Sequence, residues 1–208
     1  DLDKIFEEHR FDVVVNLAAQ TMVPYSLEHP DEDADINILG LINVLNCCRK
    51  HSVQRVIFSS SAAVYGNNIN VPLKENETSM PTSFYGITKM TAEHYMRVYN
   101  ELYGIDAIVL RFANVYGERQ GNGGEGGVIS IFAKRIASGL PISLFGDGEQ
   151  TRDFVYAGDI AEAIAAALDF KGYHILNVSN ANEVSINQLI ENFAQVARKK
   201  IKVEYKEA

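Results

Sequence analysis

The sequence has few cysteines, no long apolar run and a shortage of positive charge, and each of these narrows the class of protein. No stretch approaches the roughly 18 consecutive apolar residues of a membrane-spanning helix, so no membrane association is expected. The first ten residues, DLDKIFEEHR, are charged from the first position and do not have the pattern of a signal peptide. Acidic residues number 27 against 19 basic ones, a formal net charge of −8. We therefore expect neither a nonspecific nucleic-acid surface nor an anionic-membrane surface.

Cysteine and histidine also give no sign of a disulfide framework or a metal centre. Cys47 and Cys48 are neighbours in a helical pattern, where adjacent side chains point in different directions, so we expect no disulfide between them. Free buried thiols are typical of a reducing compartment, which favours a cytoplasmic location. The five histidines lack the spacing of metal ligands and no CxxC occurs, so we expect no metal site.

The chain alternates between short β-rich runs and longer stretches with helical spacing. Its 208 residues, 47% of them hydrophobic, suit one domain or a domain with a small lobe. We expect strands at 12–17, 55–59, 106–112, 142–145 and 173–178. We expect helices near 2–10, 31–51, 83–103, 128–138, 157–170 and 185–199. Several strands are continuous apolar runs, typical of strands covered on both faces, so the pattern predicts an α/β fold: a Rossmann-like, doubly wound parallel sheet with a small C-terminal substrate-binding lobe.

Two of the expected helices carry an apolar stripe. In the helix at 31–51 the stripe consists of Ala34, Ile38, Leu41, Leu45 and Cys48. In the helix at 83–103 it consists of Ile87, Thr91, His94, Val98 and Leu102. The favoured interpretation is that both stripes face the sheet. The alternative is that a second stripe packs against another subunit.

The ends of the chain lack elements that such a fold normally has. Dinucleotide-binding α/β folds open with a strand and a GxGxxG-like turn, and no such fingerprint occurs here. The glycine-rich segment 121–127, GNGGEGG, is interpreted instead as a flexible loop before the next helix. The last seven residues, KVEYKEA, have the pattern of a strand, and the element expected after that strand is missing. We therefore expect the chain to be a fragment of a longer protein, truncated at both ends.

The strongest chemical signal is the segment Tyr85-Gly86-Ile87-Thr88-Lys89. Residues four apart lie on one face of a helix, which places the Lys89 ammonium near the Tyr85 phenol. A phenol has a pKa of about 10, and a nearby cation lowers that pKa by favouring the phenolate. The pair therefore predicts a general base able to take a proton from a sugar hydroxyl.

Three serines lie 24 residues upstream of this pair. The run Arg55–Phe58 reads as a buried strand that ends in Ser59, Ser60 and Ser61. Ligands of open α/β sheets bind outside the carboxyl ends of the strands. A serine there can hold a substrate hydroxyl and share its proton, although three serines can also be no more than a polar strand end.

Five segments together resemble a known family. They are DVVVNLAAQ (12–20), FSSSAAVYG (58–66), SFYGITK (83–89), RFANVYG (111–117) and FGDGEQTRDFVYAGDIAEAI (145–164). They occur in the order found in the extended short-chain dehydrogenase/reductases that act on nucleotide sugars, the NAD-dependent epimerase/dehydratase family. Within it the chain is most similar to the UDP-glucose 4-epimerases.

The resemblance implies a set of site residues. Those implied to be catalytic are Tyr85, Lys89 and Ser61. Those implied to contact the cofactor NAD are Ala18, Ala19, Asn37, Ser59, Tyr85, Lys89 and Phe112. Those implied to contact the UDP-sugar are Ser61, Asn114, Val128, Phe145 and Arg152. The Arg152 guanidinium would clamp the diphosphate through its forked donors, although Arg152 and Asp153 can also be read as a surface pair.

The resemblance also implies an organisation and an activity. Residues 1–117 would form the NAD-binding core, and 118–208 mostly the nucleotide-sugar lobe, with 157–178 returning to the core. A homodimer would form through the helices at 31–51 and 83–103. The implied reaction is interconversion of UDP-glucose and UDP-galactose by transient oxidation at C4. Open alternatives are epimerases or decarboxylases of UDP-N-acetylhexosamines or UDP-uronic acids, and a non-catalytic dinucleotide- or sugar-sensing relative.

The residues after Ser61 separate epimerisation from dehydration. A 4,6-dehydratase must also remove a proton from C5 and protonate the leaving C6 hydroxyl, and related dehydratases place acidic residues just after the catalytic hydroxyl. Here the two positions are Ala62 and Ala63, whose side chains neither donate nor accept protons. The sequence therefore favours epimerisation without loss of water.

Overall fold

The computed structural model describes residues 1–121 and 127–207, which fold into two compact units. The first unit consists of Asp1–Phe112 and Ile160–Val178. The second consists of the described residues between 113 and 159 and from 179 onward. The expected division into a cofactor-binding core and a substrate-binding lobe stays a prediction.

A four-stranded parallel sheet forms the centre of the first unit, in the order β1-β2-β3-β8. Its strands are β1 (Val13–Asn16), β2 (Arg55–Ser61), β3 (Asp106–Phe112) and β8 (Tyr173–Val178). The apolar runs of the two central strands, β2 and β3, are almost wholly buried. The predicted Rossmann-like parallel sheet is confirmed, with β2 continuing through all three serines rather than ending at Ser59.

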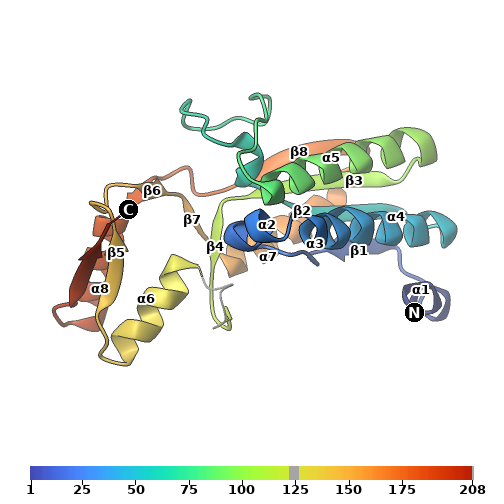
Figure 1. The fold of residues 1–208 in the computed structure, drawn as a ribbon. Helices are drawn as coiled ribbons and strands as arrows, with labels where there is room; N and C mark the ends of the chain where they lie inside the picture. The colour runs from blue at the N-terminus through green and yellow to red at the C-terminus, as the bar shows by residue number, and fades with distance from the viewer. Residues whose placement is uncertain (122–126, 208) are drawn as a thin grey trace. The chain divides into compact units, whose positions relative to one another are not determined.

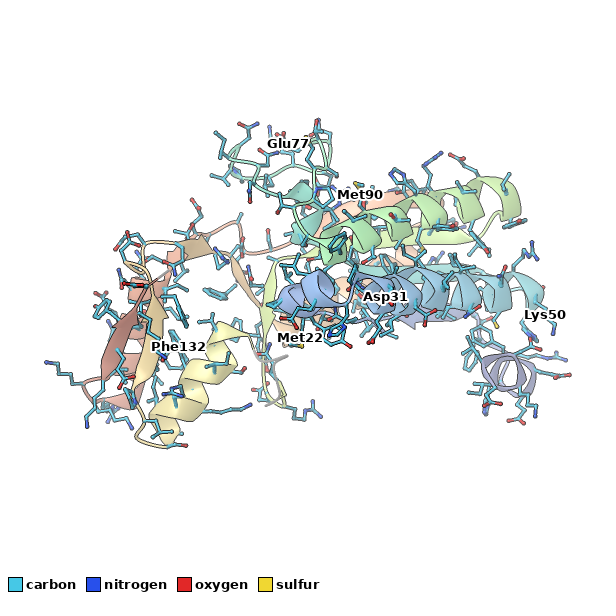
Figure 2. All side chains as sticks on the ribbon, in the orientation of Figure 1. Met22, Asp31, Lys50, Glu77, Met90 and Phe132 are labelled. Atoms are coloured by element: carbon cyan, nitrogen blue, oxygen red, sulfur yellow. The ribbon has the colours of Figure 1, made fainter. Side chains whose placement is uncertain are left out.

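Helices cover both faces of this sheet, as the continuous apolar strands require. On one face pack α1 (Leu2–Glu8), α4 (Gly40–Lys50) and α5 (Phe84–Tyr103), with α4 and α5 side by side (Figure 1). Lys50, labelled in Figure 2, is the last residue of α4 and forms an ion pair with Asp3 of α1. On the other face the later turns of α7 (Ala157–Ala166) and the 3₁₀ turn Ala167–Asp169 close over Ile57, Ile108 and Leu110.

The helix predicted at 31–51 is interrupted. It consists of α3 (Pro30–Ala34), a π-helical turn η1 (Asp35–Leu39) and α4, and it is preceded by the short helix α2 (Val23–Glu28), which the sequence pattern did not indicate. π-turns are rare and occur frequently at functional sites. Asn37 lies buried in the middle of η1, so the irregular turn orients the side chain that the resemblance singled out.

The two predicted apolar stripes face in different directions. Leu41, Leu45 and Cys48 of α4 are buried against the sheet, as expected. The stripe on α5 does not face the sheet: Ile87 is 41% exposed and Leu102 67% exposed. The sheet contacts come instead from Ala92 and Met96, because α5 has apolar residues on both faces and spacing alone does not rank them.

No helix in the described parts of the chain is long and apolar enough to cross a membrane.

The second unit is built from three short strand pairs and two helices. β4 (Asn114–Tyr116) and β7 (Phe154–Tyr156) are parallel, as are β5 (Ile142–Phe145) and β10 (Val203–Lys206), whereas β6 (Thr151–Arg152) and β9 (Val184–Ser185) are antiparallel. The helices are α6 (Val128–Ala137) and α8 (Ile186–Ala197). Phe132 of α6, labelled in Figure 2, contributes to the core they share. The glycine-rich segment predicted as a loop lies largely outside the described residues.

A buried ion pair joins α5 to the sheet of the first unit. The Arg111 guanidinium on β3 binds the Glu93 carboxylate on α5 through two hydrogen bonds of 2.9 and 2.7 Å, and both side chains are only 4% exposed. Tyr65 accepts a further bond from Arg111 at 2.8 Å, and Ser60 donates to Glu93 at 2.5 Å. These contacts fix the serine strand against α5.

Because a lone buried charge is costly, removing one partner of this pair should destabilise the fold strongly. Arg111→Met leaves Glu93 buried and unpaired, and we expect it to lower the free energy of unfolding by about 3–5 kcal/mol in urea denaturation. The matched control is Arg97→Met, which removes the exposed Arg97–Glu101 pair on α5, the helix that carries Glu93. This loss should cost roughly 0.3–0.5 kcal/mol. Equal losses in the two variants would contradict this account.

Candidate active site

The carboxyl end of β2 presents hydroxyl groups at the edge of the sheet. Ser59 donates from its hydroxyl to the Asn16 carbonyl at the end of β1, at 3.2 Å. Ser61 accepts from the Ala63 N–H at 3.2 Å and so begins the 3₁₀ turn η2 (Ala62–Tyr65). Phe112, the last residue of β3, is the register partner of Ser61. Three of the predicted site residues therefore lie at one edge of the sheet.

A glycine lets the start of α5 approach this edge. Ser83 caps α5 by accepting from the Gly86 N–H at 3.1 Å. A Cβ on Gly86 would lie 2.7 Å from the Ala63 carbonyl oxygen and 2.8 Å from the Pro81 side chain, closer than side chains tolerate. Only glycine permits this approach, which brings the first turn of α5 against the segment that follows Ser61.

The predicted catalytic pair lies on that first part of α5. The buried Lys89 ammonium donates to the Ser59 carbonyl at 2.9 Å, and its Nζ lies 5.7 Å from the centre of the Tyr85 ring. The Tyr85 backbone N–H donates to the Ser26 hydroxyl of α2 at 3.1 Å, which fixes the residue that carries the phenol. The structure thus brings Ser59, Ser61, Tyr85 and Lys89 together.

Burial dominates the electrostatics of the pair. Desolvation lowers the pKa of Lys89 to about 8, with the Asp33 charge opposing that shift. Desolvation also raises the pKa of Tyr85; a hydrogen bond with Ser61 acts against this shift and the Asp33 charge adds to it. The sequence predicted that Lys89 lowers the Tyr85 pKa. The structure differs because the ammonium is directed to the Ser59 carbonyl and the phenol is poorly solvated.

Asn37 holds the loop that follows β1. Its Oδ1 accepts from the Gln20 backbone N–H at 2.9 Å, and its Nδ2 donates to the Gln20 carbonyl at 3.1 Å. Ala18 and Ala19 lie in this loop. Ala18 is exposed, and its backbone N–H donates to Asn16 Oδ1 at 3.3 Å. The structure therefore places Asn37 as an anchor of the predicted cofactor loop, and a direct contact of Asn37 with the cofactor stays a prediction.

The four remaining predicted residues belong to the second unit. Asn114 of β4 is exposed and donates to the Asp153 carbonyl at 3.1 Å, and Val128 opens α6 at the edge of the core. Phe145 ends β5 with its ring exposed. The exposed Arg152 side chain donates to the Thr151 carbonyl at 2.7 Å. Among the described residues it forms no ion pair with Asp153, so the surface-pair interpretation is wrong.

Sequence reasoning missed several residues that support the site. Ser26 anchors Tyr85, Asp33 accepts hydrogen bonds from three different segments, and Glu93 pairs with Arg111. The Glu93 position carried a weak signal, since it lies four residues after Lys89 on the same helix face. Asp33 stands in the acidic run 31–35, and nothing in the spacing of Ser26 or Asp33 marks either residue.

Fold and site together define a class. A doubly wound parallel sheet with a hydroxyl at the end of one strand, and a tyrosine and lysine four apart on the helix packed over it, is the arrangement of a short-chain dehydrogenase/reductase. The chain belongs to the NAD dependent epimerase/dehydratase family, which it matches over residues 1–179.

Three similar proteins are each named as a 4-epimerase of a UDP-sugar. A protein of Methanocaldococcus jannaschii, provisionally named a UDP-glucose 4-epimerase, is 45% identical over 192 residues, which are 92% of this chain and 63% of the relative. The UDP-glucose 4-epimerase of Thermotoga maritima, solved with UDP-glucose, is 37% identical with a TM-score of 0.96 and covers 99% of this chain. The UDP-N-acetylglucosamine 4-epimerase of Methanobrevibacter ruminantium M1, solved with UDP-N-acetylmuramic acid, is 39% identical with a TM-score of 0.93 and covers 100%.

The chain is shorter than these proteins. It spans 63% of the length of the first relative, 67% of the Thermotoga enzyme chain and 66% of the Methanobrevibacter one. The likeness therefore extends over the whole of this chain but not over the whole of its relatives.

The lowered pKa of Lys89 has a measurable consequence for stability. Between about pH 8 and pH 10.5 the unfolded chain keeps the Lys89 proton that the folded chain has released, so stability should rise with pH in that window. We expect the difference in unfolding free energy between the protein and its Lys89→Met variant to move in favour of the protein as the pH rises through this range.

Urea denaturation of both proteins across the window measures that difference. Because Tyr85 is present in both, its own titration largely cancels. A difference that stays constant with pH, or that moves against the protein, would contradict the assigned burial of the ammonium.

Proposed function

We propose that this chain carries the catalytic centre of an NAD-dependent UDP-sugar 4-epimerase, with UDP-glucose and UDP-galactose as its substrates. The observation that supports this most strongly is the convergence of Ser61, Tyr85 and Lys89 at the end of β2. A non-catalytic sensor has no need of all three groups at the end of one strand.

The three side chains have distinct tasks. Tyr85 is the general base, which takes the proton of the sugar 4-hydroxyl as C4 is oxidised to a ketone and returns it once the sugar has presented its other face. Ser61, at the end of the strand that carries Ser59, aligns the hydroxyl that reacts. Lys89, held on the Ser59 carbonyl, has two further N–H donors for ribose hydroxyls.

The residues present fit a dinucleotide. Among the described residues the Lys89 ammonium has one hydrogen-bond acceptor, the Ser59 carbonyl, and the small Ala18 leaves the backbone after β1 open to a ligand. When bound, NAD supplies the hydride acceptor for C4 and a positive charge that favours the Tyr85 phenolate. Asn37, Ser59 and Phe112 complete the proposed set around it.

We assign the nucleotide end of the substrate to the second unit. Arg152 is exposed, and only one of its donors is engaged by a described residue, which suits a diphosphate. The Phe145 ring is exposed at the end of β5, where it can stack on a base, and Asn114 and Val128 complete the proposed contacts. The first unit then serves as the NAD-binding domain and the second as the nucleotide-sugar domain.

The proposed reaction is epimerisation rather than dehydration. Ala62 and Ala63 form the turn that follows Ser61 and bring no acid or base to C5 or C6. Water elimination without such groups would forgo roughly 10²–10⁴-fold in rate for each one missing. UDP-glucose should therefore give a product of unchanged mass.

The test is incubation of the protein and NAD with UDP-glucose, followed by mass spectrometry and NMR of the product. We expect a galactose-configured isomer, and we expect Tyr85→Phe to cut its rate by about 10²–10⁴-fold while the fold remains. A matched control is Tyr99→Phe, a tyrosine on the same helix that bonds Asn46 of α4 and should keep near-normal turnover.

Three outcomes would overturn parts of this assignment. A product lighter by one water would make the protein a dehydratase. Turnover of UDP-glucuronate or UDP-N-acetylglucosamine, but not of UDP-glucose, would keep the epimerase and change its substrate. No change in nicotinamide absorbance with any of these sugars would favour a sensor.

We also propose a homodimer formed through η1, α4 and α5. Ile36 and Leu39 on η1, and Ile87, Val98 and Leu102 on α5, are apolar and substantially exposed. A stripe of this kind on adjacent helices suits an isologous interface across a two-fold axis. Free Cys47 and Cys48, the latter with a pKa raised to about 12 by burial, are compatible with the reducing cytosol we propose as its location.

Charge placed on the stripe should separate the subunits. We expect sedimentation velocity at micromolar concentration to give a dimer for the protein and a monomer for Leu102→Glu. Leu140→Glu, at an exposed leucine of the second unit, is the matched control and should leave the dimer intact. A protein that is monomeric before any substitution would rule out this interface.

A further inference from the structure

One buried carboxylate near the proposed centre has no part in the chemistry described so far. Asp33 of α3 is 0% exposed. Its Oδ1 accepts from Gln20 Nε2 at 2.6 Å and from Asn37 Nδ2 at 3.2 Å, and its Oδ2 accepts from the Thr88 hydroxyl at 2.8 Å. All three partners are donors, which is the pattern that an ionised carboxylate requires.

These donors come from three separate parts of the first unit. Gln20 lies in the loop after β1, Asn37 in the π-turn η1, and Thr88 between Tyr85 and Lys89 on α5. Asn37 Nδ2 also lies 3.2 Å from Thr88 Oγ1, so the three side chains meet one another as well as Asp33. The carboxylate therefore ties the predicted cofactor loop and the catalytic helix to one point.

The charge of Asp33 is not neutralised by an ion pair. Within residues 1–121 and 127–207, no lysine, arginine or histidine nitrogen lies within 4 Å of its carboxylate. A buried carboxylate held only by neutral donors is costly to maintain, and it acts on nearby groups with little screening. Core packing alone therefore does not account for an aspartate at this position.

We propose that Asp33 is a positioning residue of the epimerase centre, which holds the first turns of α5 against the cofactor loop and sets the charge felt by Tyr85 and Lys89. The catalytic part of this role rests on the proposed function. Without Asp33, the Thr88 hydroxyl and the Asn37 amide would lose their common acceptor, and the phenol would lose its fixed relation to the loop.

The surrounding charges are consistent with this role. α3 packs against α2, η1 and α5. The ionisable groups nearest to it along these elements are Tyr25 and Glu28 of α2, His29 between α2 and α3, Asp35 of η1, and Tyr85 and Lys89 in the first turns of α5. Tyr25 is hydrogen-bonded to the exposed Glu32, and Glu28 and Asp35 are exposed. The Asp33 charge raises the pKa of both Tyr85 and Lys89. At Lys89 the Asp33 charge acts against the lowering of the pKa by desolvation, and so helps to keep the ammonium protonated.

The test replaces Asp33 by its neutral isostere and follows the ionisation of one tyrosine. The tyrosinate absorbance of each protein minus that of its Tyr85→Phe counterpart gives the titration midpoint of Tyr85 without any substrate. In Asp33→Asn we expect this midpoint to move to lower pH, because a negative charge that disfavours the phenolate is gone. Asp35→Asn, at an exposed aspartate two residues away, should leave it in place.

Turnover supplies a second readout. We expect Asp33→Asn to lower kcat on the order of tenfold to a hundredfold at its own optimum, with KM little changed, and to move the acidic limb of the pH profile downward. Loss of stability alone would leave the midpoint and the limb where they are. A folded Asp33→Asn variant with an unchanged Tyr85 midpoint overturns the proposal.

The absorbance readout keeps this inference separate from the proposed function. If no UDP-sugar is turned over but the midpoint still shifts, the epimerase assignment fails and the role of Asp33 toward Tyr85 stands. If Asp33→Asn does not fold, Thr88→Val replaces it, with Thr88→Ser as the conservative control. Val removes one donor from the carboxylate and should move the midpoint to higher pH, whereas Ser should restore it; equal midpoints in both overturn the proposal.

Discussion

The hydrogen bond from the Lys89 ammonium to the Ser59 carbonyl is the contact on which the proposed centre depends. Lys89 lies one helical turn after Tyr85, and Ser59 lies two residues before Ser61 on the same strand. A single bond of 2.9 Å between helix and strand therefore holds the helical turn that carries the phenol at the end of the strand that carries the hydroxyl. Its cost is the burial of an ammonium group, which brings the pKa of Lys89 down to about 8.

Burying polar groups at this depth requires every partner to be in place. α5 meets that requirement over about two turns: Thr88 binds Asp33, Lys89 binds Ser59, and Glu93 binds Arg111. The helix is thus attached to the sheet and to the segment before α4 by polar contacts as well as by packing. Rigid attachment of this kind suits a base whose proton transfer depends on distance.

The sequence predicted the parts of the molecule that are written in local pattern. The apolar runs of β2 and β3, and the positions of Tyr85 and Lys89 on one helix, follow from spacing. The π-turn at Asn37 does not, because it depends on contacts with Gln20 and Thr88, 17 and 51 residues away. The apolar stripe predicted to face the sheet lies on the exposed side of α5, because both sides of that helix are apolar. In the second unit, strands of two and three residues are too short for alternation to mark them.

Retention of an isotope at C4 tests the central claim most directly. Transient oxidation and re-reduction within one closed site return the same hydrogen to the carbon that lost it. With UDP-glucose deuterated at C4, the account predicts a galactose-configured product, identified by NMR, that keeps its deuterium at C4 in ordinary water. Loss of that deuterium to the solvent would contradict it, because C4 would then have been inverted by proton exchange rather than by oxidation.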